Sequence, residues 1–124
     1  MPEGRFRRAL RRLTADDDER LAEDLLHEAE RHGCCPIADA PDRAPVALHG
    51  TLQSVTLRPR GGVPALEAEL YDGSGTVYVV WLGRRRIEGI RPGVSLVVEG
   101  RIGGEPGKRT LFNPAYRLMP SRGA

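Results

Sequence analysis

From Val46 onward, apolar and polar residues alternate along the chain, which is the pattern of strands with one buried face. The alternation predicts five strands, at about 46–58, 63–72, 76–83, 94–102 and 110–118. In the first strand the parity set by Val46 and Leu52 changes at Gln53-Ser54, which predicts a bulge there. In the fifth strand, Pro114 has no backbone N–H to donate, and this predicts an edge position or a bulge.

The segments between the strands help to decide how the strands assemble. Asp72 to Gly75 is a tight hairpin signal, and residues 84–91 form a connector with room for one helical turn. A small set of short strands avoids exposed edges best by closing into a barrel. The long, bent first strand and the connector favour a five-stranded Greek-key OB-fold barrel over an SH3-like barrel. The predicted fold class is therefore mainly β, with an N-terminal α-helix before the barrel.

Helical spacing replaces the alternation at the N-terminus. Apolar residues at i, i+4 and i+7 predict a short helix over about 5–13 (Phe6, Leu10 and Leu13). Thr14 and the acidic residues after it begin a second helix, which Gly33 ends. We expect one face of this helix to pack on the domain or on a second copy, with docking of another protein as the alternative. The predicted divisions are a basic arm and acidic amphipathic helix (1–33), a linker (34–45) and the barrel (46–119).

Size and cysteine content narrow the class of protein. A chain of 124 residues fits one domain. The longest apolar run, Val77 to Leu82, is much shorter than the roughly 20 residues that a membrane-spanning helix needs. No apolar stretch follows the N-terminal arginines, so we expect no signal peptide. Cys34 and Cys35 are adjacent, which disfavours a disulfide and indicates a cytoplasmic location.

Charge is distributed unevenly, although the net charge is only +2. Residues 1–12 carry five arginines against Glu3, and residues 14–32 carry eight acidic residues against two arginines. Residues 43–124 carry twelve lysines or arginines against six acidic residues. A basic globular part therefore follows an acidic segment, and a basic domain is compatible with a nucleic-acid partner.

Residues 46–118 resemble the OB-fold nucleic-acid-binding family, in the variant found in the wedge domain of a branch-migrating DNA helicase. The resemblance rests on HGTLQSV (49–55), LYDGSGTVYVVWLG (70–83), IRPGVSLVVEGRI (90–102) and LFNPAYRLM (111–119). Matching positions are Asp72, Gly73, Gly75, Gly93, Gly100, Asn113 and Pro114. The chain as a whole is similar to small actinobacterial OB-fold proteins. It has no GxxxxGK[ST] motif and therefore no helicase motor, and the resemblance implies a role in DNA repair or recombination.

Cations and aromatic residues fall where an OB-fold barrel binds its ligands, on the second and third strands and the loops beside them. The predicted nucleic-acid-binding residues are Arg58, Arg60, Tyr71, Tyr78, Arg84, Arg85, Lys108 and Arg109. Loop cations would contact phosphates, and the two tyrosines would stack on bases. The alternatives are solvated loop arginines and half-buried strand tyrosines. Glu67 and Glu69 share the outward parity of Tyr71 and would repel phosphates.

Other aromatic and titratable residues receive structural interpretations. We expect Trp81 inside the barrel, and Phe112 and Tyr116 as a plug of the barrel or a contact for the N-terminal helix. His49 is expected to face outward at the surface. His27 and His32 are five residues apart rather than four, so the spacing predicts no metal site. No catalytic motif is present, and we expect no enzyme activity and no cofactor.

These observations together predict a protein that binds nucleic acid without catalysis, single-stranded DNA more readily than RNA. Binding of this type is tolerant of sequence and strongly dependent on salt. The second hypothesis is an adaptor that binds another protein through the barrel and the N-terminal helix. A further hypothesis is that the acidic helix masks the basic arm or the basic groove.

Overall fold

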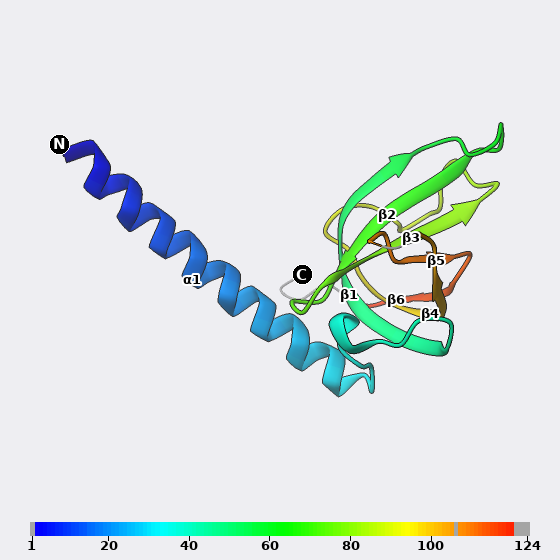
Figure 1. Ribbon diagram of the computed structural model, residues 1–124, viewed down its shortest axis with the longest axis horizontal. Helices are drawn as coiled ribbons and strands as arrows, with labels where there is room; N and C mark the ends of the chain where they lie inside the picture. Colours follow the sequence, from blue (N-terminus) through cyan, green and yellow to red (C-terminus); the bar gives the residue numbers. More distant parts are fainter. Residues whose placement is uncertain (1, 106, 121–124) are drawn as a thin grey trace.

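The computed structural model describes residues 2–105 and 107–120, and of residues 2–16 the backbone only. The chain is mainly β, with one long helix before the strands (Figure 1). The elements are α1 (Pro2–Arg31), the short 3₁₀ helix η1 (Ile37–Asp39), β1 (Pro45–Leu57), β2 (Ala65–Tyr71), β3 (Thr76–Leu82), β4 (Ser95–Gly103), β5 (Thr110–Phe112) and β6 (Ala115–Leu118). No helix of this described part combines the length and the apolar character needed to cross a membrane.

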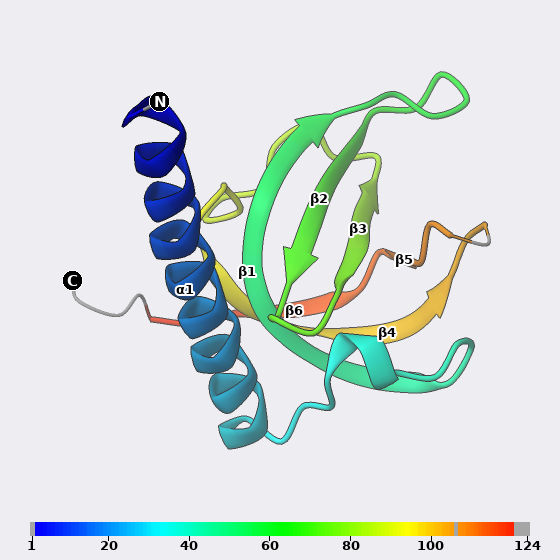
Figure 2. The ribbon, with the colours of Figure 1, turned by 60° about the vertical axis from the view of Figure 1, so that its left-hand side comes forward.

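Five strands close into a ring in the order β1-β2-β3-β5-β4, and β4 returns to pair with β1 (Figure 2). The β3–β5 pair is parallel, and the other pairs of the ring are antiparallel. This closure confirms the mainly β class with a helix before the strands. β6 pairs with residues Leu96–Glu99 of β4, whereas β5 pairs with Ile102 and Gly103 farther along the same strand.

The interior of the ring is filled by the apolar side chains at alternate positions of each strand, as the alternation predicts. Its fully buried side chains include Leu48, Leu52, Leu70, Val77, Val79, Leu96, Val98, Ile102 and Leu111. Trp81 is also buried, as expected, and its indole N–H donates to the carbonyl of Pro114 at 3.3 Å. The register of β1 against β2 shifts between Leu52 and Ser54, which confirms the predicted bulge. Beyond the bulge Val55 packs against the core.

The last predicted strand, 110–118, is two strands in the structure. Asn113 has φ of 50°, so the chain leaves the extended conformation just before Pro114. The side-chain oxygen of Asn113 accepts from the N–H of Leu82 at 2.8 Å, and its own N–H donates to Val80 at 2.7 Å. Asn113 therefore holds the break against the end of β3.

The expectation for two aromatic residues on either side of this break was wrong. Phe112 and Tyr116 neither plug the barrel nor lie buried beneath α1, because they are 44% and 41% exposed. Ile87 and Ile90, from the connector between β3 and β4, join the core in their place. The connector is made of turns, and the helical turn considered for it is not formed.

α1 is one continuous helix rather than the two predicted around Thr14. Its C-terminal part lies across the outside of β1, where Leu25 and Ala29 are buried. Ala29 and Cys34 pack against Val97 of β4. The N-terminal part extends away from the ring (Figure 1).

The segment expected as a linker is packed on the ring. η1 lies within it, and Ile37 is 1% exposed and belongs to the core. The Asp72 carboxylate, fully buried, accepts from the N–H of Ile37 at 2.7 Å and from the N–H of Ser74 and Gly75 at 2.9 and 3.2 Å. The hairpin Asp72–Gly75 therefore also anchors the segment that joins helix to barrel.

Candidate nucleic-acid interface

The outer face of β2, β3 and β5 brings four of the predicted residues together. Strand pairing sets Glu69 beside Tyr78, and Glu67 beside Val80. On the other side of β3, Val80 pairs with Phe112. Because directly paired residues point to the same side of a sheet, Tyr78, Glu67 and Phe112 share this face.

Glu67 lies at the centre of the face and is only 6% exposed. One carboxylate oxygen lies 3.0 Å from the Lys108 ammonium, and the other lies 3.6 Å from the Arg60 guanidinium. The repulsion of phosphates expected from Glu67 is thus offset by two cations that come from opposite loops. Burying a carboxylate costs free energy unless the group is paired, and these two cations supply the pairing.

Each of these two cations also covers an aromatic ring. The Lys108 ammonium lies 4.8 Å from the centre of the Tyr78 ring, and the Arg60 guanidinium lies 5.6 Å from the centre of the Phe112 ring. Both distances are within the range of a cation–π contact. The face therefore carries two aromatic rings, each beside a cation, with one carboxylate joining the cations.

Arg58 completes this set at the end of β1. It lines a shallow hollow of about 110 Å³ on the same face. The other residues of the hollow are Ser54, Thr56, Glu67, Glu69, Tyr78 and Lys108. We call this hollow, together with Arg60 and Phe112, the β2–β3–β5 face.

Phe112 is the residue of this face that sequence reasoning assigned elsewhere. Its parity in a single strand over 110–118 gave no reason to place it beside Arg60. The break at Asn113 and the parallel pairing of β5 with β3 place it there. The Asn-Pro pair after Phe112 was the available signal that the strand ends early.

The remaining predicted residues lie away from the centre of the face. Tyr71 is half-buried at the far end of β2, paired with Thr76 rather than with Tyr78. Arg84 and Arg85 are exposed on the connector after β3. The N–H of Gly83, just before them, donates to Pro64 at 2.7 Å, so this pair of arginines follows the sheet at the same end as the β1–β2 loop.

Arg109 stabilises the fold and does not belong to the β2–β3–β5 face. Its guanidinium donates to the carbonyl of Ile37 at 2.8 Å, to the carbonyl of Ala40, and to a carboxylate oxygen of Asp42 at 3.1 Å. These three acceptors lie in the segment around η1. We therefore leave Arg109 out of the residues that contact a ligand on the β2–β3–β5 face.

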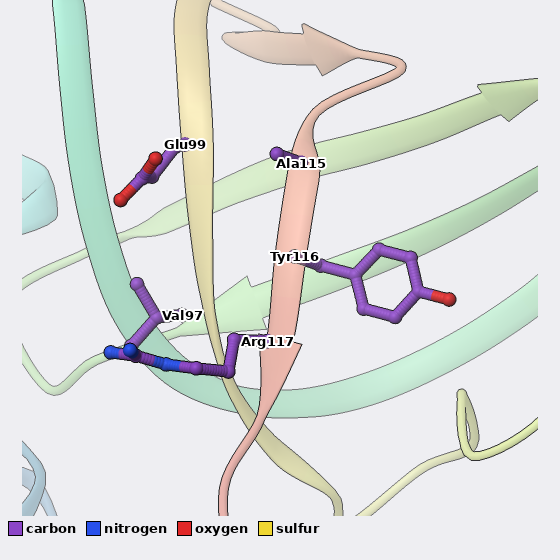
Figure 3. A pocket seen from close by; sticks show the side chains of 5 residues that line it. All are labelled: Val97, Glu99, Ala115, Tyr116 and Arg117. Carbon is purple, nitrogen blue, oxygen red and sulfur yellow. The ribbon is translucent and has the colours of Figure 1, made fainter.

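A second hollow lies across β4 and β6, but its side chains do not converge (Figure 3). Glu99 and Arg117 lie on one side of these strands, and Tyr116 points to the other side, where it meets Trp81 edge-on at 5.7 Å. One acid and one arginine on this surface give no charge preference. The β2–β3–β5 face is the better candidate for an anionic ligand.

His49 was expected at the surface, but it is buried in the structure. It has the outward parity predicted for it, but α1 covers it, and it is 2% exposed. Its ring stacks on that of His32, with 5.1 Å between the ring centres. Burial lowers the pKa of His49, and the neighbouring His32 lowers it further, against a smaller opposing effect of Glu28 and Asp72.

Comparison with known proteins adds no relative. No protein-family model matches the chain, and a search of the curated proteins finds none similar to it in sequence. The fold and the contacts on the β2–β3–β5 face are therefore the structural evidence that bears on function.

Proposed function

We propose that the ring is a Greek-key OB-fold barrel that binds single-stranded nucleic acid on the β2–β3–β5 face, without catalysis. The ring order, with its parallel β3–β5 pair and its bent β1 shared between β2 and β4, supports the barrel assignment. The proposed ligand is single-stranded DNA more readily than RNA. That preference, and a role in DNA repair or recombination, derive from the resemblance of residues 46–118 to helicase wedge domains.

The observation that carries the proposal is the pair of rings on one face, Tyr78 beside Lys108 and Phe112 beside Arg60. Proteins that bind single strands combine aromatic rings, on which bases stack, with cations that follow the phosphates. Here one base stacks on each ring. The Lys108 ammonium and the Arg60 guanidinium, both about two-fifths exposed, turn from the rings toward the phosphates on either side.

The charge of this face sets the expected strength of binding. Arg58, Arg60 and Lys108 face two carboxylates, those of Glu67 and Glu69. The small positive excess gives weak phosphate attraction for one copy of the chain. Arg84 and Arg85 extend the cationic path beyond the end of β3.

The proposal is tested by fluorescence anisotropy with labelled oligo-dT of about 20 nucleotides at two salt concentrations. Binding should weaken several-fold as salt rises. At the lower salt concentration, the double variant Arg60→Ala/Lys108→Ala should lose most of the affinity that the unchanged chain has for the oligonucleotide. The control Arg91→Ala/Arg101→Ala makes the same change in net charge at exposed positions outside this face, and should have a small effect. Equal losses in the two double variants would contradict a site on the β2–β3–β5 face.

A second candidate function is that of an adaptor for another protein. The observation in its favour is that Leu21 of α1, a large apolar side chain, is 53% exposed. An adaptor would not respond to salt or to the Arg60 and Lys108 substitutions. It would respond to substitution of Leu21 or Leu26, whereas Leu25 is buried against β1 and its substitution would disturb the packing of α1. Absence of oligonucleotide binding at about 100 μM protein, the weak end of non-specific binding, would favour this candidate.

A further inference from the structure

A cluster of metal-ligating side chains lies where α1 crosses β1, away from the β2–β3–β5 face. Glu28 and His32 are one helical turn apart, and His49 comes from the strand beneath them. One ligand atom from each of the three lies within 4.8 Å of the other two. The set of two imidazoles and one carboxylate is one that zinc and other divalent transition metals prefer.

The end of α1 brings Glu28 and His32 together, because the N–H of His32, one residue after the helix, still donates to the carbonyl of Glu28 at 3.2 Å. Residues four apart lie on the same face of a helix. The distance between the Glu28 carboxylate and Nε2 of His32 is 3.7 Å. The other carboxylate oxygen of Glu28 pairs with Arg31 at 2.5 Å, which orients the group. The five-residue spacing of His27 and His32 gave no sign of this site, whereas the spacing of Glu28 and His32 is the signal for it.

His49 supplies an independent observation that points to a ligand. Its side chain is 2% exposed, and its Nδ1 atom has no hydrogen-bond partner among the described residues. A buried polar atom without a partner costs free energy, and native structures rarely retain one without a reason.

Space and further oxygen donors are available beside the cluster. A hollow of about 370 Å³ adjoins Glu28, His32 and His49 at the junction of α1 with β1 and β4. Asp24, one turn before Glu28, also lines it, and so do the hydroxyls of Thr51 and Ser95, which hydrogen-bond to each other at 3.1 Å. Water can enter this hollow and complete the coordination of an ion.

We propose that Glu28, His32 and His49 bind one divalent transition-metal ion, zinc in the first place, and that the ion fastens α1 to β1. Zinc bonds to nitrogen and oxygen are about 2.0–2.2 Å long, so small side-chain rotations would draw the three groups together. Three protein ligands leave a fourth position for water. Because Glu28 is on α1, His32 is in the turn that directly follows it and His49 is on β1, binding stabilises the docked position of α1.

The test is a titration of the full chain with zinc, followed by calorimetry, and with cobalt(II), followed by its visible absorption. We expect one ion per chain and an absorption spectrum of a four- or five-coordinate ion. His49→Gln and His32→Gln should each reduce affinity by about tenfold or more, because each removes a ligand. His27→Gln is the matched control, since His27 is exposed on the same helix, and it should bind as the unchanged chain does.

Further measurements separate loss of the site from loss of folding and from metal binding by the cysteines. Circular dichroism without metal checks that the His49→Gln and His32→Gln chains are folded, and Glu28→Gln tests the site without altering a buried histidine. The double variant Cys34→Ser/Cys35→Ser should retain the ion, because the proposal gives the two thiols no part in it. Failure to bind zinc, or binding that is lost with the cysteines and kept without His32 and His49, would overturn the proposal.

Discussion

Lys108 and Glu67 form an ion pair of 3.0 Å at the centre of the outer face of β2, β3 and β5. The pair links the loop before β5 to the middle of β2, and the same ammonium covers the Tyr78 ring. Glu67 therefore holds two cations, Lys108 and Arg60, close to the two rings where we place the bases. The carboxylate competes with phosphates for both cations.

Replacing Glu67 should strengthen binding to a single strand. Glu67→Gln keeps the shape of the side chain but releases Lys108 and Arg60, so affinity for oligo-dT should rise several-fold and its salt dependence should become steeper. The cost in stability should be about 1 kcal/mol or less, because water still reaches both cations. Glu88→Gln, an equal charge change at an exposed position, is the control for anisotropy. Unchanged or weaker binding by Glu67→Gln would contradict the proposed position of the ligand.

Removal of the rings should weaken binding without altering the charge. Tyr78→Ala and Phe112→Ala should each cost about 1–3 kcal/mol, the range measured for one stacked base. Tyr116→Ala is the matched control, since Tyr116 is similarly exposed but packs against Trp81 away from this face. Titrations by anisotropy at one salt concentration compare the three. An effect of Tyr116→Ala as large as that of the other two would contradict stacking on the face.

Asp72 should be among the residues on which stability depends most. Asp72→Ala removes the acceptor of three backbone N–H groups, including that of the buried Ile37. The loss should be about 3 kcal/mol or more, because buried donors remain without partners. Urea unfolding measures it, with the exposed Asp39→Ala as control. If the two variants unfold at the same midpoint, Asp72 does not anchor this segment.

The contact between α1 and the β2–β3 turn can be tested with a pair of glycines. Gly73 and Gly83 both have positive φ, 94° and 76°, so alanine is strained at either position. A Cβ at Gly73 would also collide with the backbone of Ala22 in α1, whereas a Cβ at Gly83 meets nothing within 4 Å. Gly73→Ala should therefore lower the melting temperature more than Gly83→Ala does. It should also speed hydrogen exchange near Ala22, and equal exchange in both variants would argue against this contact.

Stability should fall on mild acidification because of His49. Its folded-state pKa lies below the unfolded value of about 6.5, so the unfolded chain binds the proton more tightly. The contribution of His49 to folding stability is fully present above about pH 6.5. It decreases as the pH falls from there toward the folded-state pKa. His32 lowers the pKa along with burial, while Glu28 and Asp72 oppose the shift. Unfolding in a chelator from pH 8 to 5 should show a flatter profile for His49→Gln than for His27→Gln, and identical profiles would exclude this role.

Much of the barrel could be predicted because strand parity is a local property. The alternation placed Trp81 and the core residues inside, and the change of parity at Gln53 located the bulge. The single helix was harder to predict, because Thr14 is typical of a helix start and yet lies within α1.

The parts of the site that could not be predicted depend on contacts between distant segments. Burial of His49 needs α1 to lie across β1, which no local pattern indicates. Arg109 has the same sequence context as its neighbour Lys108, yet its guanidinium donates to carbonyls near η1 instead of lying on the β2–β3–β5 face. Phe112 was expected as a plug or a helix contact because 110–118 was predicted as one closing strand, whereas the strand breaks at Asn113 and Phe112 is exposed beside β3.

Binding of a single strand on the β2–β3–β5 face is tested most directly by an NMR titration of the ¹⁵N-labelled full chain with oligo-dT at low salt. We expect the largest amide shift changes on this face and its loops, around Thr56, Tyr78, Lys108 and Phe112. Changes centred on the β4–β6 surface around Arg117, or on α1, would contradict binding on this face, as would spectra that do not change at all.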